Sequence, residues 1–287
     1  LYADAANNGQ GYDARELTAD EVPGLPQMDR YLLARTRRLI AQVSAHMDAF
    51  EISDACDEVS DFIDMLTNWY IRNTRDRFWN EDENAFNTLY TVLEAFMRVL
   101  APLAPMEAET VWRGLTGGDS VHLGDWPYLT DPATSEDTAL GRVLVEDGDL
   151  VAAMDKVREV VSATLSLRKA KKMRGRQPLA KLTVVVDEPS QVDGYDALLK
   201  SELNIKDVEY STLDEAADHG LKIIDELKVN ARAAGPRLGK QVQFAIKASK
   251  SGDWHTDPAT GDPVIETPNG TITLQGDEYD ITRRVEE

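Results

Sequence analysis

Arginine and aromatic side chains are concentrated in one short segment, residues 68–79. On a continuous helix Asn68, Arg72, Arg75 and Trp79 follow one another at steps of four, three and four, so they would share one face. Guanidinium groups bind phosphates, and aromatic rings stack on unpaired bases. The segment therefore predicts an RNA-binding stripe, whose candidate residues are Trp69, Arg72, Arg75, Arg77 and Trp79.

The same residue types can equally serve packing. Aromatic rings are core builders first, so Trp69 and its aromatic neighbours could be buried. Arginine also suits a partly buried carboxylate, because its planar fork binds both oxygens. If the second and fourth helices run antiparallel, Arg72 or Arg75 is expected to pair with Glu107 or Glu109. Packing and RNA contact both remain open for this segment.

A second cluster is purely basic and covers residues 168–181, which contain no acidic residue. Its cations are Arg168, Lys169, Lys171, Lys172, Arg174, Arg176 and Lys181. The first six are candidate contacts to an RNA backbone, since clustered cations bind phosphates. A solvated basic loop without a partner is the alternative.

The overall charge favours a different class of partner. The chain has 287 residues, with 31 basic and 51 acidic side chains and a net charge of −20. Such a balance opposes general attraction to nucleic acid, so RNA would have to be bound through the local basic clusters. An acidic helical module that binds protein is therefore kept as an alternative.

The sequence contains no pattern that predicts catalysis. It lacks a phosphate-binding loop and a Gly-x-Ser-x-Gly elbow. The histidines His46, His122, His219 and His255 are scattered, and Cys56 is the single cysteine. We therefore expect no catalytic residue, no metal site and no cofactor in this chain. No apolar run reaches the roughly 18 residues that span a membrane, and we expect a cytoplasmic location.

The elements that must position these clusters are mostly helices. Apolar residues recur at steps of three and four from Met28 onward, which predicts four helices in an antiparallel bundle over about residues 28–118. The predicted core residues are Phe62, Leu66, Leu89, Leu93 and Phe96. An extended connector over 119–135 and a further helix over 137–170 follow, with Gly148 as a point of interruption.

Beyond Pro178 short β-branched runs alternate with polar residues, as is typical of a small α+β domain. The strand candidates are 182–186, 205–210, 221–229 and 271–274. The predicted fold class is mainly α, with an antiparallel helical bundle followed by a small α+β C-terminal domain. The predicted parts are an opening loop over 1–27, the bundle over 28–130, a connecting helix and basic segment over 131–177, and the α+β domain over 178–287.

Several motifs together resemble one family over about residues 25–245. They are Met-Asp-Arg-Tyr-Leu-Leu at 28–33, Asn-Trp-Tyr-Ile-Arg at 68–72, Ala-Pro-Leu-Ala-Pro at 101–105, Arg-Gln-Pro-Leu at 176–179 and Asn-Ile-Lys-Asp-Val at 204–208. The first resembles the start of the anticodon-binding bundle of class I aminoacyl-tRNA synthetases. The second is similar to the signature of the isoleucine–tRNA ligases. The equivalent region of a valine or methionine enzyme is the neighbouring alternative.

The resemblance implies a partner and also implies missing parts. It implies that the chain binds tRNA(Ile) as a monomer through its anticodon-binding bundle. ATP and Mg²⁺ would belong to a catalytic domain whose His-Ile-Gly-His and Lys-Met-Ser-Lys-Ser motifs do not occur here. Because the sequence starts at Leu1 and runs into polar material, we expect a C-terminal fragment. Because the two motifs are missing, we expect this fragment to be inactive alone.

Overall fold

The computed structural model describes residues 2–186, 190, 192–216, 223–257, 260–267 and 270–285. The chain divides into two compact units, Leu1–Asp155 and Lys156–Glu287. The division falls within a single helix, so the predicted connecting segment 131–177 is shared between the two units. His219 and Leu221, which entered the histidine survey and a predicted strand, lie outside the described residues.

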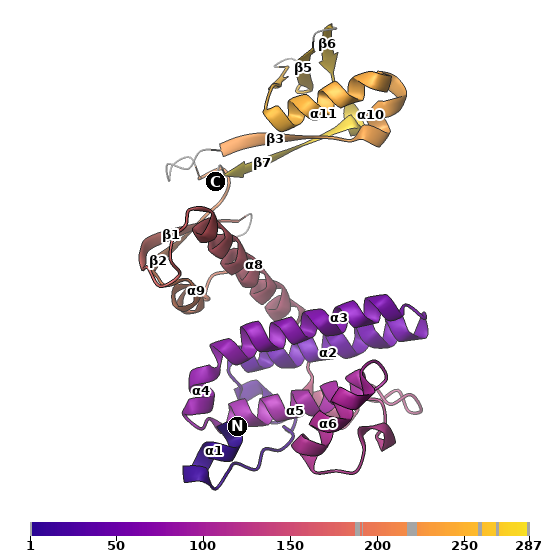
Figure 1. The fold of residues 1–287 in the computed structure, drawn as a ribbon, viewed down its shortest axis with the longest axis vertical. Coiled ribbons are helices and arrows are strands. Elements are labelled where there is room, and N and C mark those ends of the chain that lie inside the picture. The colour runs from indigo at the N-terminus through magenta and orange to yellow at the C-terminus, as the bar shows by residue number, and fades with distance from the viewer. Residues whose placement is uncertain are drawn as a thin grey trace. The chain divides into compact units, whose positions relative to one another are not determined.

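The first unit is the predicted helical bundle (Figure 1). Its main elements are α2 (Gln27–Asp48), α3 (Ile52–Asp64), the π-helical segment η2 (Met65–Ile71), α4 (Arg75–Trp79), α5 (Glu83–Leu100) and α6 (Pro105–Thr116). Helices α2 and α3 lie side by side as a hairpin, and α5 packs against α2 and α6. The mainly α architecture is confirmed.

Local chemistry sets the helix boundaries in this unit. The Asp82 carboxylate accepts hydrogen bonds from the backbone N–H groups of Asn84 (2.9 Å) and Ala85 (3.3 Å), which caps the start of α5. Helix α6 begins at Pro105, where a missing N–H costs nothing. It ends at Gly117, whose φ of +64° is the left-handed conformation that glycine adopts without strain.

The bundle core contains three of the five residues that were predicted for it. Phe62, Leu66 and Phe96 are buried as predicted, and the ring centroids of Phe62 and Phe96 lie 5.1 Å apart. Leu89 and Leu93, however, are only half-buried. The fully buried face of α5 instead passes through Ala85, Thr88, Val92, Ala95 and Val99. Small and β-branched residues permit close helix approach there, and the two leucines cover its edge.

The predicted opening loop is partly wrong, because residues Tyr2–Gly9 form helix α1 and Val22–Gly24 form a 3-10 turn, η1. Tertiary contacts hold this segment in place. The ring of Tyr12 stacks on Phe86 with centroids 5.2 Å apart, and the N–H of Leu17 donates to the Thr91 hydroxyl at 2.9 Å. The Asn- and Gly-rich composition predicted a loop, but packing against α5 orders part of this segment.

The helix predicted over 137–170 is two helices. After a short 3-10 turn, η3 (Val121–Leu123), come α7 (Ala139–Val143) and α8 (Gly148–Ala170). The break falls just before Gly148, where the Asp147 carboxylate accepts from the N–H of Leu150 at 3.1 Å and starts α8. The position of Gly148 thus marks a helix start and not a mid-helix defect.

The second unit carries the α+β structure. Strands β1 (Leu179–Val185) and β2 (Ile205–Ser211) pair in parallel, and the connection between them contains helix α9 (Asp196–Leu203). Strands β3 (Ile223–Val229) and β7 (Tyr279–Val285) pair antiparallel, and a three-stranded sheet contains β4 (His255–Thr256), β5 (Pro263–Thr267) and β6 (Gly270–Thr273). The pieces between them are α10 (Ala231–Leu238), η5 (Gly239–Gln241), α11 (Val242–Ser251) and η6 (Gly276–Glu278).

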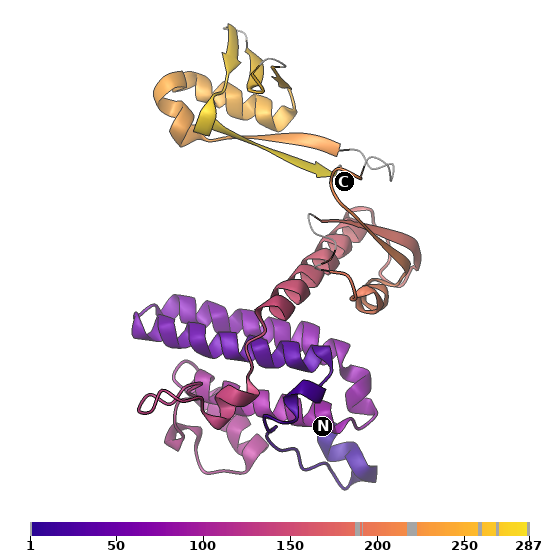
Figure 2. The same cartoon turned by 180° about the vertical axis from the view of Figure 1, so that it is seen from behind.

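Helix α11 covers β3 and contacts β5, as the reverse view also shows (Figure 2). The apolar core beneath it consists of Leu227, Ala245, Ala248, Ile265, Ile272 and Leu274. The sequence patterns predicted four of the strands here but none of the helices α9, α10 and α11, which are short and rich in alanine or charge. None of the helices in the described ranges combines the length and apolar character that crossing a bilayer requires.

Candidate nucleic-acid interface

The predicted Arg/aromatic stripe is interrupted by a change of helix type. Residues Met65–Ile71 form a π-helical segment, which winds by about one extra residue per turn. A separate short helix, α4, then starts at Arg75. The regular four-three-four spacing from Asn68 to Trp79 therefore does not describe one continuous helical face.

Three aromatic side chains of this region lie in the bundle core. Trp69 is 5% exposed, and Tyr70 and Phe78 are also buried. A ring that is buried in the bundle cannot stack on a base, so the assignment of Trp69 as an RNA contact is corrected to a packing role. For Trp69, Tyr70 and Phe78 the packing interpretation therefore holds.

Arg77 is held in a buried ion-pair network. Its Nη1 and Nη2 donate to the two carboxylate oxygens of Asp29, both at 2.7 Å, and its Nε donates to Asp82 at 2.8 Å. The Tyr70 hydroxyl donates to the same Asp29 carboxylate at 2.8 Å. Asp29 is 0% exposed, so this bidentate contact neutralises a fully buried charge. Arg77 is therefore a structural residue, a second correction to the RNA-contact set.

The ionisation of the neighbouring groups reflects this network. Burial, followed by the adjacent Asp29 carboxylate, raises the pKa of Tyr70 well above its ordinary value. Partial burial opposes ionisation of Asp82, but the hydrogen bond and the charge of Arg77 outweigh it and lower the pKa of that carboxyl. Over the neutral pH range the Tyr70 hydroxyl therefore keeps its proton and the Asp82 carboxyl stays ionised.

Three of the five candidate RNA contacts in this segment remain on the surface: Arg72, Arg75 and Trp79. Arg75 and Trp79 are four residues apart on α4, so they lie on the same side of that helix. Trp79 is 64% exposed, and an exposed indole ring is a side chain on which bases stack. These three residues, called the α4 patch below, keep the chemistry that the sequence predicted.

The expected pairing of Arg72 or Arg75 with α6 is wrong, because Glu107 forms no ion pair within the described residues and Glu109 has other partners. Its carboxylate pairs with Arg113 of its own helix at 2.6 Å and accepts from the Ser120 hydroxyl at 2.9 Å and the Val121 N–H at 3.0 Å. Arg77 and Asp29 form a long-range arginine–carboxylate pair in this region instead. Glu109 instead anchors the loop that follows α6.

Arg168 belongs to the interior of the basic segment. It is 4% exposed, and its Nη1 donates to the carbonyl oxygens of Arg174 (3.1 Å), Gly175 (3.3 Å) and Gln177 (3.0 Å). Its Nη2 donates to the carbonyl of Leu203 at 2.7 Å. The guanidinium of Arg168 thus binds four backbone carbonyls and fixes the conformation of the chain after α8. Its assignment as a phosphate contact is corrected to a structural role.

The next five cations are displayed by the turn that Arg168 organises. They are Lys169, Lys171, Lys172, Arg174 and Arg176, called the basic turn below, and all are exposed. In the described part of the chain none of them forms an ion pair, whereas Lys181 pairs with Glu209 on the neighbouring strand. Lys169 also lies in the last turn of α8, where a cation complements the helix dipole.

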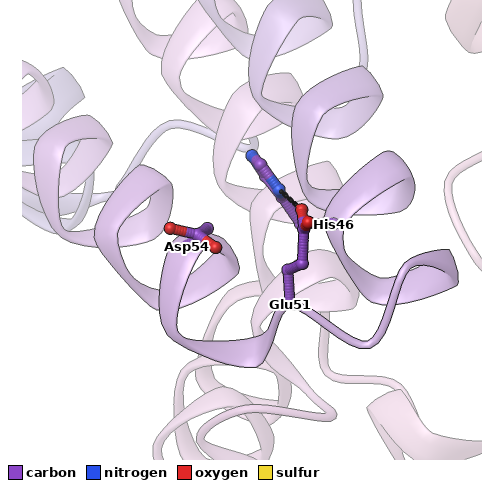
Figure 3. Close-up of side chains that lie close together, drawn as sticks. All are labelled: His46, Glu51 and Asp54. Carbon is purple, nitrogen blue, oxygen red and sulfur yellow. Dashed lines mark hydrogen bonds and ion pairs between the residues drawn. The ribbon is translucent and has the colours of Figure 1, made fainter.

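A group of possible metal ligands lies at the α2–α3 corner, where the sequence predicted none (Figure 3). One ligand atom each from His46, Glu51 and Asp54 lies within 4.8 Å of the others, and His46 Nδ1 is 2.8 Å from a Glu51 oxygen. That hydrogen bond raises the pKa of His46 above 6.5. Spacing could not reveal the group, because a tight turn between two helices brings the residues together.

Comparison with known proteins agrees with this architecture. A family model described as "Anticodon-binding domain of tRNA ligase" matches residues 29–185, from α2 to the end of β1. The isoleucine–tRNA ligase of Bifidobacterium longum (strain NCC 2705) is 72% identical over 287 residues, which is 100% of this chain and 26% of that protein.

Further relatives have the same name. The isoleucine–tRNA ligase of Nocardia farcinica is 46% identical over 252 residues, covering 88% of this chain and 22% of the relative. That of Leifsonia xyli subsp. xyli is 43% identical over 292 residues, covering 98% and 23%. The chain therefore spans about a quarter of the length of the curated relatives it matches.

Proposed function

Since this chain belongs to the anticodon-binding domain family of tRNA ligases, we propose that it is the tRNA-holding part of an isoleucine–tRNA ligase. Its ligand would be tRNA(Ile), bound by a monomeric protein in the cytoplasm. The whole protein would activate isoleucine with ATP and Mg²⁺ and attach it to the tRNA. Those reactions would use parts of the protein outside this chain, which supplies binding and orientation.

The observation that carries the proposal is the basic turn. Five exposed cations lie within eight residues, in a chain whose net charge is −20. Like charges at this spacing repel one another, and the described structure supplies them with no carboxylate partner. A sugar–phosphate backbone provides the missing negative charge at regular intervals. The acidic remainder of the surface would repel RNA elsewhere and so favour one orientation of the bound molecule.

The α4 patch supplies the second kind of contact. An exposed tryptophan beside an arginine can stack on an unpaired base while the guanidinium binds a neighbouring phosphate. Such bases occur in RNA loops and not within duplexes. We therefore assign base stacking to Trp79 with Arg75 beside it, a phosphate contact to Arg72, and further backbone contacts to the basic turn.

The test is the salt dependence of tRNA binding by the full-length protein. Changing Lys171, Lys172 and Arg174 together to alanine removes up to three phosphate contacts. The negative slope of log K against log salt should then become shallower by about 2–3. Lys181→Ala is the control, because Lys181 already pairs with Glu209, and it should leave the slope within about one. Unchanged affinity and slope in the triple variant would reduce the basic turn to a solvated loop.

Two other assignments are distinguished by the same binding assay. The net charge of −20 favours an acidic module that binds protein, and absence of any tRNA binding by the unaltered protein would support that function. Equal affinity for tRNA(Ile), tRNA(Val) and tRNA(Met) would remove the isoleucine assignment. We expect tRNA(Ile) to bind most tightly.

A further inference from the structure

A second stretch without acidic residues lies in the C-terminal part of the chain. Residues 227–252 contain no aspartate or glutamate, although 51 acidic residues occur in the 287. The stretch contains the cations Lys228, Arg232, Arg237, Lys240, Lys247 and Lys250. It folds mainly as α10 and α11, and it is separate in sequence from the basic turn.

Helix α11 divides cleanly into two faces. Val242, Ala245 and Ala248 are buried, and the last two belong to the core over β3 and the three-stranded sheet. The exposed side chains are Gln243, Phe244, Lys247, Lys250 and Ser251. At about 100° per residue these five fall within an arc of about 120°, so they form one continuous surface, called the α11 face below.

Carboxylates compensate some cations of this stretch but not those of the α11 face. Arg237 pairs with Glu278, and Lys228 lies opposite Asp280 in the β3–β7 register. Within the described ranges, Lys247 and Lys250 form no ion pair. Lys250 is in the last turn of α11, where it complements the helix dipole, but Lys247 is one turn earlier and gains less from it.

The composition of the α11 face matches RNA better than an acidic protein. Phe244 is 41% exposed and three residues from Lys247, so a ring and an ammonium group are neighbours on the surface. An acidic peptide would use the ammonium groups alone. An RNA strand would use both, because its phosphates bind lysine and its unpaired bases stack on aromatic rings.

We infer that the α11 face is a second RNA-contact surface, at which Lys247 and Lys250 bind phosphates and Phe244 stacks on an unpaired base of the bound tRNA. This inference rests on the proposed function and adds a contact to it. Gln243, on the same arc, can donate or accept hydrogen bonds to the sugar or the base edge. Binding through two basic surfaces separated in the sequence would hold the RNA in one orientation.

The charge component is tested in the full-length protein with tRNA(Ile) as the probe. Changing Lys247 and Lys250 together to glutamine should make the negative slope of log K against log salt shallower by about 1.5–2. The matched control changes Lys156 and Lys200 to glutamine, because these lysines already lie beside Glu159 and Asp207. The control should alter the slope by less than one.

The stacking component has a separate readout. Phe244→Ala should weaken tRNA binding about 5- to 150-fold, as loss of one base–aromatic stack does, with the salt slope unchanged. Phe244→Tyr keeps a ring and should retain affinity. Unfolding temperatures within a few degrees of the unaltered protein would show that each variant is folded, and these exposed sites should meet that condition.

The outcomes separate the inference from the proposed function. Loss of tRNA affinity in the basic-turn variant with no change in any α11 variant would overturn the inference and leave the function standing. No change in either set would overturn the inference and also leave the basic turn as a solvated loop, and no tRNA binding at all would overturn both the inference and the proposed function. If the lysine variant kept its tRNA affinity but lost binding to polyglutamate, the α11 face would be a site for acidic protein, which also overturns the inference.

Discussion

Arg77→Ala should destabilise the helical unit strongly, because the change strands a buried charge. Asp29 has no exposed surface and accepts two hydrogen bonds of 2.7 Å from Arg77. After the change, only the Tyr70 hydroxyl would remain of the side-chain donors to Asp29 that the structure describes. Breaking a buried pair in this way costs about 3–5 kcal/mol. For a unit of this size that corresponds to a fall in Tm of roughly 6–20 °C.

Tryptophan fluorescence during urea or thermal unfolding measures this change. Four of the five tryptophans, Trp69, Trp79, Trp112 and Trp126, lie in the helical unit, so the signal reports mainly on it. A double variant, Asp29→Leu with Arg77→Met, removes both charges and should lose much less stability than the sum of the single variants.

The same variant separates structure from RNA binding. At a temperature where it remains folded, Arg77→Ala should bind tRNA like the unaltered protein, whereas Arg75→Ala should bind more weakly. A loss of less than about 1 kcal/mol on changing Arg77 would refute the argument that the ion pair supports the bundle. Weakened tRNA binding by folded Arg77→Ala would restore this arginine to the RNA-contact set.

Two further predictions concern packing and pH. A Cβ atom at Gly141 would lie 1.9 Å from the carbonyl oxygen of Leu129, so Gly141→Ala should destabilise the helical unit by about 1–3 kcal/mol in urea unfolding. The control is Gly114→Ala, at a helix position with open space around it, which should stabilise the unit by about 0.5–1 kcal/mol. By NMR titration, His46 should have a pKa above 6.5 that returns toward 6.5 in Glu51→Gln. Because the pKa of His46 is raised in the folded state, its pair with Glu51 contributes stability that is complete below about pH 6.5 and is lost as the pH rises through the folded pKa. An unshifted pKa of His46 would show that the pair does not form in solution.

Helical periodicity and local signals determined most of the architecture. The bundle helices, the break near Gly148 and the strands β1 and β2 follow from the spacing of apolar residues and from caps such as Asp82, which act within a few residues of the chain. The motifs also identified the family, because several short matches in the correct order are jointly specific. The chemistry of the basic turn was visible for the same reason, since a run of cations without acids needs no fold to be recognised.

Only the tertiary structure decided which residues of each cluster remain available. Trp69 is buried in the bundle core, and the π-helical segment at Met65–Ile71 breaks the regular spacing that would have placed Asn68 and Trp79 on one face. Arg77 and Arg168 had the same residue type as their exposed neighbours, but a distant carboxylate and four backbone carbonyls took their donors. A side chain that can bind phosphate can equally satisfy a buried acceptor. The choice between those partners depends on which groups folding brings within hydrogen-bond distance, and residue types along the chain do not encode that distance directly.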